Sequence, residues 1–404
     1  MNIAILHAGT SGFFPRYYKA LKDVIETDGG IVKLFVPNSG RNSRNKLPNQ
    51  IMWGSRLNWF AHNFFHKLTG VQDVFSVIET ILLIRKLEKF QPDLLHFNII
   101  NDKIINLPLL VYYVNKNNIP VVWTMHDCRA FTGQCTYFDE AHCNKWKDGC
   151  GQCPKCETLF DNTKITWNIR RKYHAHIKRL TIVTPSQWLA SLVKDSFFKE
   201  IPIRVIYNGV DLDGFSKKTD FDVRRHYNIP ANKRIILGCA INWDKRKGVT
   251  YFEELSKILP PEYQIVLIGN ICKEEKERLT RTNILCIGKT KTFTELVAWY
   301  KSSDVFCNTT LADNFPTVNL EALASGTPVI TFNTGGSPEA VSDDCGIVVE
   351  QGNVDDLFKA IVKVTSNRDI YSSQCCILRS KLFSNNQYNN YLHLFHEILE
   401  KTTK

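Results

Sequence analysis

Two carboxylates eight residues apart suggest a site for a polar ligand near the start of a helix. Asp313 precedes Phe-Pro in "DNFPTVNLEALASGTPVI", and Glu321 lies on the apolar helix expected over 317–324. A second strand–loop–helix pattern follows in "NTGGSPEAV", where a glycine pair allows close backbone approach and Glu339 supplies another acid. Helix N-termini offer free N–H groups and a positive dipole to phosphate. The two starts together predict a pocket for a phosphate and for polyol hydroxyls.

Each acid taken alone has a simpler interpretation. Asp313 would then cap a helix, and Glu321 would be a solvated helix residue. Pro316 is expected at the first helical position, where its missing N–H costs nothing, and Gly326 with Pro328 would end the helix. The two acids beside two predicted helix starts favour the binding site.

Strand and helix patterns alternate along the chain, which predicts parallel sheets covered on both faces. The predicted strands are Asn2–His7, Gly30–Val36, Leu94–Phe97, Pro120–Met125 and Thr181–Thr184 in the first half, and Ile203–Ile206, Arg234–Cys239, Gln264–Ile268, Ile284–Ile287, Val305–Asn308, Pro328–Thr331 and Gly346–Val349 in the second. The predicted helices include Tyr17–Glu26, Val77–Lys89, Thr250–Ile258, Phe293–Ser302 and Thr317–Ala324.

The length of 404 residues suits two domains. The turn-rich "IYNGVDLDGF" interrupts the pattern and predicts an N-terminal domain over 1–205 and a C-terminal domain over 206–382. Apolar residues in 383–404 are spaced as in a closing amphipathic helix: Leu392, Phe395, Ile398 and Leu399. Two facing doubly wound domains would leave a ligand cleft between the carboxyl ends of their strands.

The composition indicates a folded chain that favours anionic partners. Hydrophobic residues make up 44% and charged residues 23%, so disorder is excluded as the general state. The net charge of +11 favours nucleotide phosphates, nucleic acid or an acidic membrane surface. The start "MNIAIL" predicts a buried strand instead of a signal peptide, and no run approaches the ~18 apolar residues of a membrane helix. A cytoplasmic protein is expected.

The segment "DNFPTVNLEALASGTPVITFNTGGSPEAV" resembles the donor-binding segment of the retaining glycosyltransferases of family 4, whose GT-B fold has two facing Rossmann-like domains. That family has a Glu, seven residues and a second Glu, and the matching positions here are Asp313 and Glu321. The resemblance implies that Asp313 contacts the donor sugar, that its backbone neighbours hold the diphosphate, and that Glu321 holds the nucleotide ribose.

Other motifs extend the resemblance over nearly the whole chain. "VIYNGVDLDGF" is similar to the inter-domain segment, and "NWDKRKGVTYF" to the Lys-Gly phosphate motif, with Lys247 as the matching lysine. Asn242 stands where the family usually has Arg, so Arg246 or Lys245 is expected to supply the charge. "TMHDC" places His126 near the donor sugar, and "HAGTSGF" is similar to the glycine-rich loop after the first strand. The implied catalytic residues are His126, Lys247, Asp313 and Glu321, and the implied donor-binding residues are Gly12, Arg246, Lys247, Asn314, Phe315, Pro316, Thr317, Glu321, Gly335, Gly336 and Glu339.

Six of the thirteen cysteines lie within residues 128–156. The double Cys-x-x-Cys at Cys150, Cys153 and Cys156 suits tetrahedral zinc. Cys135, Cys143, Cys150 and Cys153 are the predicted ligands of a structural zinc ion, with Cys156 as an alternative. An iron–sulfur cluster and free thiols in a loop are the competing interpretations. Colanic-acid-type polysaccharide glycosyltransferases carry a similar insert, which implies a structural or acceptor-side role.

The stretch "SRLNWFAHNFFHKLTG" (55–70) combines aromatic and basic residues. It suits a helix at a membrane interface, and it equally suits an ordinary helix whose aromatic residues belong to the core. If the acceptor is a lipid-linked sugar, this element is the expected place of membrane contact.

The favoured function is transfer of a hexose from a nucleotide diphosphate sugar to a polysaccharide or lipid-linked glycan, without a catalytic metal or cofactor. Asp211-Leu-Asp213 only superficially resembles a metal triplet and is assigned to the inter-domain segment. The alternatives are an epimerase or sugar-phosphate synthase of the same fold, and a zinc protein that binds nucleic acid. No Gly-x-Gly-x-x-Gly opens either half, which disfavours a NAD enzyme. Nucleic acid is not an expected partner.

Overall fold

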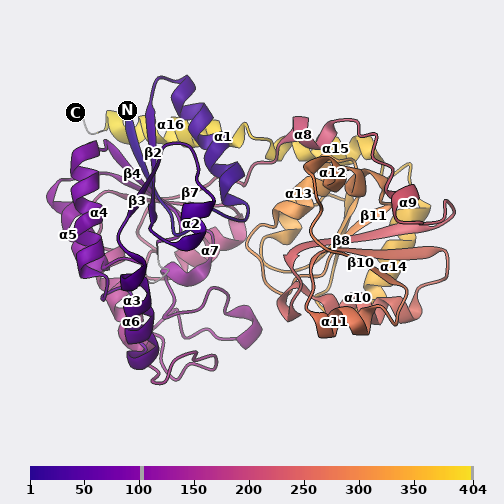
Figure 1. The fold of residues 1–404 in the computed structure, drawn as a ribbon, viewed down its shortest axis with the longest axis horizontal. Helices are drawn as coiled ribbons and strands as arrows, with labels where there is room; N and C mark the ends of the chain where they lie inside the picture. The colour runs from indigo at the N-terminus through magenta and orange to yellow at the C-terminus, as the bar shows by residue number, and fades with distance from the viewer. Residues whose placement is uncertain (101–103, 402–404) are drawn as a thin grey trace. The chain divides into compact units, whose positions relative to one another are not determined.

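The computed structural model describes residues 1–100 and 104–401, apart from the side chains of Asn58 and Glu140. The chain forms two compact units, each with its own parallel sheet (Figure 1). The N-terminal unit comprises Met1–Tyr207 together with Gln387–Lys404, and the C-terminal unit comprises Asn208–Asn386. The division therefore lies two residues beyond the predicted boundary, and the closing helix belongs to the N-terminal unit.

The sheet of the N-terminal unit has the strand order β3-β2-β1-β4-β5-β6-β7, and all pairs are parallel. Its strands are β1 Asn2–Leu6, β2 Ile31–Pro37, β3 Gln50–Trp53, β4 Leu94–Phe97, β5 Val121–Thr124, β6 Leu180–Thr184 and β7 Ile203–Val205. Edge strand β3 was not predicted, and β7 was assigned to the wrong half of the chain. The order reverses between β1 and β4, where doubly wound sheets form a ligand crevice.

The sheet of the C-terminal unit has the equivalent order β10-β9-β8-β11-β12-β13 and is also parallel. Its strands are β8 Arg234–Asn242, β9 Tyr263–Asn270, β10 Ile284–Ile287, β11 Val305–Asn308, β12 Val329–Phe332 and β13 Gly346–Val349. All six were predicted, because runs of β-branched residues bounded by turn residues mark buried parallel strands. Its switch point lies between β8 and β11.

Helices complete both units. The N-terminal unit contains α1 Phe14–Thr27, α2 Gly40–Arg44, α3 Arg56–Thr69, α4 Val77–Phe90, α5 Leu107–Lys116, α6 Thr163–His174, α7 Gln187–Lys194 and α16 Gln387–Glu400. The C-terminal unit contains α8 Leu212–Ser216, α9 Val223–His226, α10 Val249–Ile258, α11 Lys273–Leu279, α12 Phe293–Ser302, α13 Thr317–Ala324, α14 Val354–Ser366 and α15 Ser373–Ser380. Short 3-10 turns are η1 Cys128–Ala130, η2 Asp139–Ala141, η3 Lys245–Lys247, η4 Ser337–Ala340 and η5 Lys381–Phe383. Among the described residues, no helix combines the length and apolarity needed to cross a membrane.

Helix α16 packs beside α1 in the N-terminal unit (Figure 1). Its most buried residues are Tyr388, Tyr391, Leu394 and Phe395, and three of the four apolar residues used to predict it, Leu392, Ile398 and Leu399, are only partly buried. The Tyr391 hydroxyl lies 3.0 Å from Thr124 Oγ1 at the end of β5. The last segment of the chain therefore helps to fix the carboxyl end of the N-terminal sheet.

Candidate functional site

Lys247 and Asp313 meet at the switch point of the C-terminal unit. Lys247 closes η3, directly after β8, and Asp313 lies in the loop after β11. The Lys247 Nζ atom donates a hydrogen bond of 2.7 Å to Asp313 Oδ2, and the two side chains are 21% and 17% exposed. Asp244 caps η3 by accepting from the Lys247 amide at 2.8 Å. Two residues predicted from separate motifs thus form one partly exposed ion pair.

Close backbone contacts hold the loops around this pair. Gly248 has φ +73°, and a Cβ atom there would collide with the Thr309 carbonyl oxygen. Gly335 has φ +55°, and a Cβ atom there would collide with the carbonyl oxygen of Asp313. Glycine is needed at both positions because other L-residues rarely adopt this backbone conformation and have no space here. The loops after β8, β11 and β12 are therefore joined at the level of the main chain.

Glu321 lies on α13 and is only 4% exposed. The Tyr300 hydroxyl donates to Glu321 Oε2 at 3.1 Å, and burial raises the pKa of Tyr300 well above its ordinary value. The interpretation of Glu321 as a solvated helix residue is therefore wrong. A buried carboxylate with a fixed orientation is suited to hold ligand hydroxyls.

The two predicted helix starts differ in detail from the expectation. Pro316 is the extended N-cap residue of α13 and not its first helical residue, which is Thr317. The second start is the 3-10 turn η4, only four residues long. The first start therefore has a full helix behind it, whereas the second presents a short turn after the glycine pair.

Polar side chains that sequence reasoning missed connect the two starts. Asn308 Nδ2 donates to Asn319 Oδ1 at 2.9 Å, and Asn319 Nδ2 donates to the Ser337 carbonyl at 3.4 Å. Arg379 of α15 donates to the carbonyl oxygens of Glu339 at 2.8 Å and of Ala340 at 3.1 Å. No local motif marks these residues, because asparagine on an apolar helix and arginine on a distant one are common.

The basic residue that accompanies Lys247 is Arg246. Its Nη1 donates to the carbonyl oxygen of Ala312 at 2.8 Å, next to Asp313. Lys245 is exposed, and Asn242 accepts from Asn270 at 3.1 Å at the exposed end of β8. Arg246 thus joins the site from a different position than the Arg of the family pattern.

The remaining predicted donor-binding residues surround the same loops. Asn314 and Phe315 are buried after Asp313, and Asn208 Nδ2 donates to the Phe315 carbonyl at 3.3 Å. Gly336 is buried at the start of η4, whereas Glu339 is half-buried. The hydroxyls of Thr334 and Ser337 flank the glycine pair and, among the described residues, have no hydrogen bond. The C-terminal unit thus brings together the predicted donor-binding residues other than Gly12.

His126 and Gly12 belong to the N-terminal unit. His126 follows β5, and its Nε2 lies 2.8 Å from Asn98 Oδ1. Burial lowers the pKa of His126 to about 4, so the ring is neutral near pH 7. Gly12 has φ +74° in the exposed turn before α1. A second histidine at this edge of the sheet was missed. His7 follows β1 and stacks on Phe14, and burial lowers its pKa well below the ordinary value.

His96 is a buried residue of β4, inside the predicted strand Leu94–Phe97. It is 0% exposed, and its Nε2 lies 2.9 Å from Thr124 Oγ1 and 3.3 Å from the Tyr17 hydroxyl. Burial lowers its pKa to about 3. The ring is therefore a neutral part of the core near pH 7.

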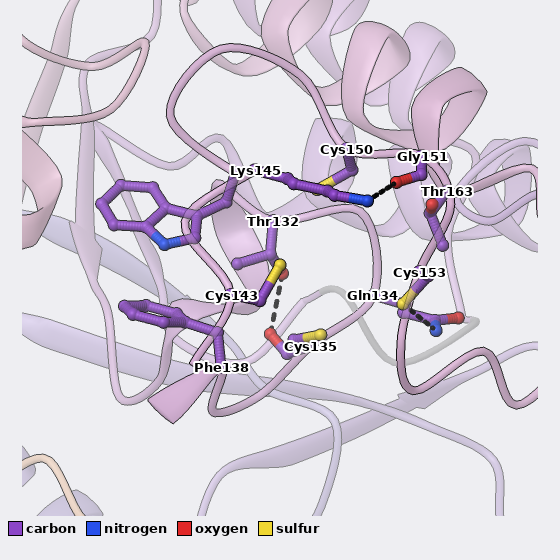
Figure 2. Close-up of a pocket in the computed structure, with 11 residues that line it drawn as sticks. Thr132, Gln134, Cys135, Phe138, Cys143, Lys145, Cys150, Gly151, Cys153 and Thr163 are labelled. Atoms are coloured by element: carbon purple, nitrogen blue, oxygen red, sulfur yellow. Dashed lines mark hydrogen bonds between the residues drawn. The ribbon is translucent and has the colours of Figure 1, made fainter. Parts of the chain in front are cut away.

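The cysteine insert folds around a small cavity of about 20 Å³ (Figure 2). Its lining includes the four predicted zinc ligands Cys135, Cys143, Cys150 and Cys153. Cys156 does not line it and donates instead to the Thr158 carbonyl at 3.6 Å. Burial and the neighbouring thiols raise the pKa of Cys135 to about 12. Within residues 1–100 and 104–401, no three His, Cys, Asp or Glu side chains stand in a ready coordination shell.

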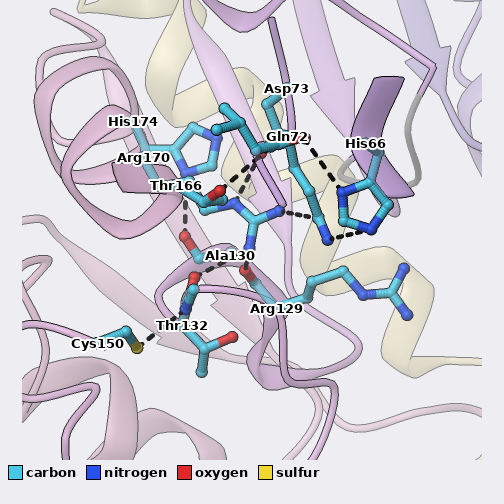
Figure 3. A network of polar contacts seen from close by, with 12 residues as sticks. His66, Gln72, Asp73, Arg129, Ala130, Thr132, Cys150, Thr166, Arg170 and His174 are labelled. Carbon is cyan, nitrogen blue, oxygen red and sulfur yellow. Dashed lines mark hydrogen bonds and ion pairs between the residues drawn. The ribbon is translucent and has the colours of Figure 1, made fainter. Parts of the chain in front are cut away.

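A buried arginine contacts the first residues of the cysteine insert. Arg170 on α6 is 0% exposed, and its Nε donates to Asp73 Oδ2 at 2.7 Å (Figure 3). The same guanidinium donates to Gln72 Oε1 and to the carbonyls of Arg129 and Thr132, all within 2.9 Å. Burial alone raises the pKa of Asp73, but the charge and the hydrogen bond of Arg170, together with the nearby His174 and His62, outweigh burial and hold the pKa below its ordinary value. Arg170 therefore connects three chain segments through hydrogen bonds: residues 72–73, residues 129–132 and helix α6.

Comparison with known proteins assigns both units. Residues 221–380 match the family model described as "Glycosyl transferases group 1", and residues 29–213 match "Glycosyltransferase Family 4". This chain belongs to the family 4 and group 1 glycosyltransferases. The candidate site lies in the group 1 glycosyltransferase region.

Individual relatives of this glycosyltransferase are distant. WcaC of Escherichia coli K12, provisionally named a colanic acid biosynthesis glycosyl transferase, is 24% identical over 275 residues, 65% of each chain. A D-inositol 3-phosphate glycosyltransferase of Corynebacterium jeikeium is 27% identical over 210 residues, 47% of this chain and 50% of the relative. The match therefore spans between half and two thirds of the length of these two proteins.

Solved structures with the same fold cover nearly the whole glycosyltransferase. Sucrose-phosphate synthase from Thermosynechococcus elongatus has a TM-score of 0.72 at 16% identity and covers 99% of this chain and 100% of its own. Anabaena HepE, solved in complex with UDP, has a TM-score of 0.71 at 14% identity and covers 98% of this chain and 100% of its own. At such identities the likeness shows the fold alone, and it confirms the predicted α/β GT-B class with two Rossmann-like domains.

Proposed function

We propose that this glycosyltransferase moves a hexose or hexose derivative from a nucleotide diphosphate sugar to a glycan or lipid-linked glycan, with retention at the anomeric carbon. The observation that carries the proposal is the Lys247–Asp313 ion pair at the β8/β11 switch point, with the buried Glu321 on the helix that follows β11. Ligands of open parallel sheets bind at such a point. The UDP bound to HepE supports a nucleotide diphosphate as ligand of this fold.

Each charged group has a proposed role that follows from its surroundings. Lys247 and Arg246 face the diphosphate, together with the backbone of residues 314–317 and the glycine pair Gly335 and Gly336. Because Lys247 is already paired with Asp313, the incoming diphosphate competes for the ammonium group and leaves Asp313 to accept from sugar hydroxyls. The buried Glu321 accepts from the two ribose hydroxyls, held in place by Tyr300.

The proposed reaction breaks the bond between the anomeric carbon and the diphosphate while the acceptor oxygen bonds to the same face of that carbon. Positive charge develops on the sugar, and negative charge develops on the leaving diphosphate, where Lys247 and Arg246 stabilise it. The leaving phosphate oxygen takes the acceptor hydroxyl proton, so no protein base and no metal is assigned. His126 keeps its proposed role as a neutral hydrogen-bonding partner of the sugar.

A thermal-shift screen with UDP, GDP and ADP tests the donor site. One nucleotide at about 100 times its Kd should add roughly 2.7 kcal/mol to the free energy of unfolding of the unit that binds it. Glu321→Ala should remove most of this stabilisation, whereas the exposed control Glu350→Ala should keep it. If no nucleotide stabilises the wild type, or if Glu321→Ala responds as the wild type does, the proposed function is wrong.

We also propose a cytoplasmic location with peripheral contact at the inner membrane face, and a structural zinc ion in the cysteine insert. The zinc proposal is supported by the four thiols that line one cavity (Figure 2), a donor set suited to zinc. Metal analysis of the purified protein should give about one zinc per chain. Cys150→Ser should lose the metal, and Cys156→Ser should retain it. Equal zinc in both variants, or none in the wild type, would contradict the proposal.

A further inference from the structure

Helix α3 has an inverted distribution of side chains. Leu57, Phe60, Phe64 and Leu68 recur at helical spacing, and all four are exposed, Leu57 at 81% and Phe60 at 63%. The opposite side buries His62 and His66 at 1% and 2% exposure. An ordinary surface helix buries its apolar stripe and exposes its polar one. The exposed apolar face of α3 is therefore suited to contact an apolar environment outside the N-terminal unit.

This exposed apolar surface continues onto the segment that follows the cysteine insert. Leu159 and Phe160 are 72% and 57% exposed, and the Leu159 amide donates to the carbonyl of Lys67 on α3 at 3.2 Å. Asn162 Nδ2 donates to the Thr69 carbonyl at 2.7 Å. Contiguous apolar surface of this kind marks an interaction site, because soluble proteins rarely expose it otherwise.

A cavity of about 690 Å³ adjoins α3 at the switch point of the N-terminal sheet. Its lining includes His7 after β1, Arg41 on α2, and Arg56 and Phe60 on α3. In the described part of the chain, the guanidinium groups of Arg41 and Arg56 have no hydrogen bond or ion pair. Phe60 both lines the cavity and belongs to the exposed stripe of α3, so the cavity opens directly onto the apolar surface.

The geometry points to a lipid-linked sugar phosphate as the occupant of this cavity and surface. The phosphate groups bind Arg41 and Arg56, since guanidinium matches phosphate with two parallel hydrogen bonds. The lipid chain and the membrane surface contact the apolar stripe of α3, and Lys67 on the same helix faces anionic headgroups. The cavity volume lies within the range that holds a small ligand such as a sugar. This inference rests on the proposed function, because it names the acceptor class.

Vesicle flotation of the full chain tests the inference. The probes are phosphatidylcholine vesicles carrying a polyprenyl diphosphate, and matched vesicles carrying phosphatidylglycerol at the same total charge. The wild type should bind the diphosphate vesicles more tightly, and Arg41→Gln/Arg56→Gln should lose this preference with at least about a tenfold fall in affinity. The charge-matched control Arg225→Gln/Arg281→Gln, in the C-terminal unit, should bind as the wild type does.

A second pair of variants tests the apolar stripe. Phe60→Ser/Phe64→Ser should lose about tenfold or more in affinity for both anionic vesicle types. The control Leu378→Ser/Leu382→Ser, which removes equally exposed apolar residues from the C-terminal unit, should have no effect. All four variants should keep the stabilisation by the nucleotide, which separates a failure here from a failure of the proposed function.

Two outcomes would overturn the inference while the nucleotide response persists. In the first, the wild type binds phosphatidylglycerol and polyprenyl diphosphate vesicles equally well at matched charge. In the second, Arg41→Gln/Arg56→Gln and its control bind alike. An absent nucleotide response in the wild type would instead remove the proposed function on which the acceptor assignment rests.

Discussion

The two switch points share one strand order and differ in how their loops are held. In the C-terminal unit, the loops after β8, β11 and β12 touch through their main chains, at Gly248 and Gly335. In the N-terminal unit, the loops around the cavity are held by side chains. Asn42 accepts from the Thr10 amide at 3.1 Å and donates to the carbonyls of Ala8 and Pro37 at 3.1 and 3.0 Å. Arg170, paired with Asp73, donates to the carbonyl of the lining residue Arg129 at 2.8 Å. The nucleotide diphosphate proposed for the C-terminal unit presents the same phosphate groups whichever sugar it carries, which suits recognition by the main chain. The acceptor proposed for the N-terminal cavity would instead be bound by side chains, among them Arg41 and Arg56.

The charge of the two sites differs as well. Lys247, Asp313 and Arg246 supply ionic groups in the C-terminal unit. Around the N-terminal switch point, burial keeps His7 and His126 neutral. Arg41 and Arg56 line the cavity beside α3. Breaking each support in turn should therefore have different consequences for the two units.

The largest expected effect is the loss of the buried ion pair. Arg170→Met should lower the free energy of unfolding of the N-terminal unit by about 3–5 kcal/mol, because Asp73 is left charged and buried. Urea unfolding checks this value. The control Arg171→Met, an exposed arginine on the same helix, should cost little. Nucleotide stabilisation of the C-terminal unit should persist in both variants.

A double variant sharpens the interpretation. Asp73 has φ +67°, a conformation that asparagine tolerates, so Asp73→Asn/Arg170→Met removes both charges without new backbone strain. It should be more stable than Arg170→Met alone. The single variants Arg170→Met and Asp73→Asn are measured beside it. If the double variant loses as much free energy of unfolding as the two single variants together, Asp73 and Arg170 are not energetically coupled, and the network in Figure 3 does not stabilise the unit as described.

A smaller effect is expected at the glycine of the C-terminal site. Gly335→Ala should cost about 1–2 kcal/mol from its positive φ alone, and the collision with the Asp313 carbonyl should also displace that loop and weaken nucleotide binding. Gly288→Ala is the matched control, because nothing lies within 4 Å of a Cβ atom there. Urea unfolding and the nucleotide thermal shift check both variants. Normal nucleotide binding by Gly335→Ala would show that the main-chain contact does not shape the site.

The difference between the sites also explains what the sequence could predict. The strand Val305–Asn308 and the helix Thr317–Ala324 were predicted with their observed ends, because β-branched runs, Pro and Gly mark such boundaries locally. Asp73 and Arg170 are 97 positions apart, and no local pattern connects them. Strand β3 was missed because "QIMW" is short and lacks an alternating pattern. The buried state of Glu321 depends on Tyr300 from another helix and could not be read from its own segment.

The last expected effect is spread over several pH units and separates the two units by acid sensitivity. Burial lowers the pKa of His96 and of His174 to about 3, below the ordinary value near 6.5. Between these values the unfolded chain binds more protons than the folded one, so stability is fully present above about pH 6.5 and falls as the pH drops. Each histidine contributes about 1.4 kcal/mol per pH unit in that window. The C-terminal unit contains only one histidine, His226.

Hydrogen exchange at about pH 7.5 and about pH 5, corrected for the intrinsic rates, compares the core strands of the two units. Protection of β4 should fall more steeply on acidification than protection of β11. His96→Asn should reduce the fall in β4, because asparagine cannot take up a proton when the chain unfolds. Equal losses in β4 and β11 would mean that carboxylates common to both units, and not the buried histidines of the N-terminal unit, control the acid response.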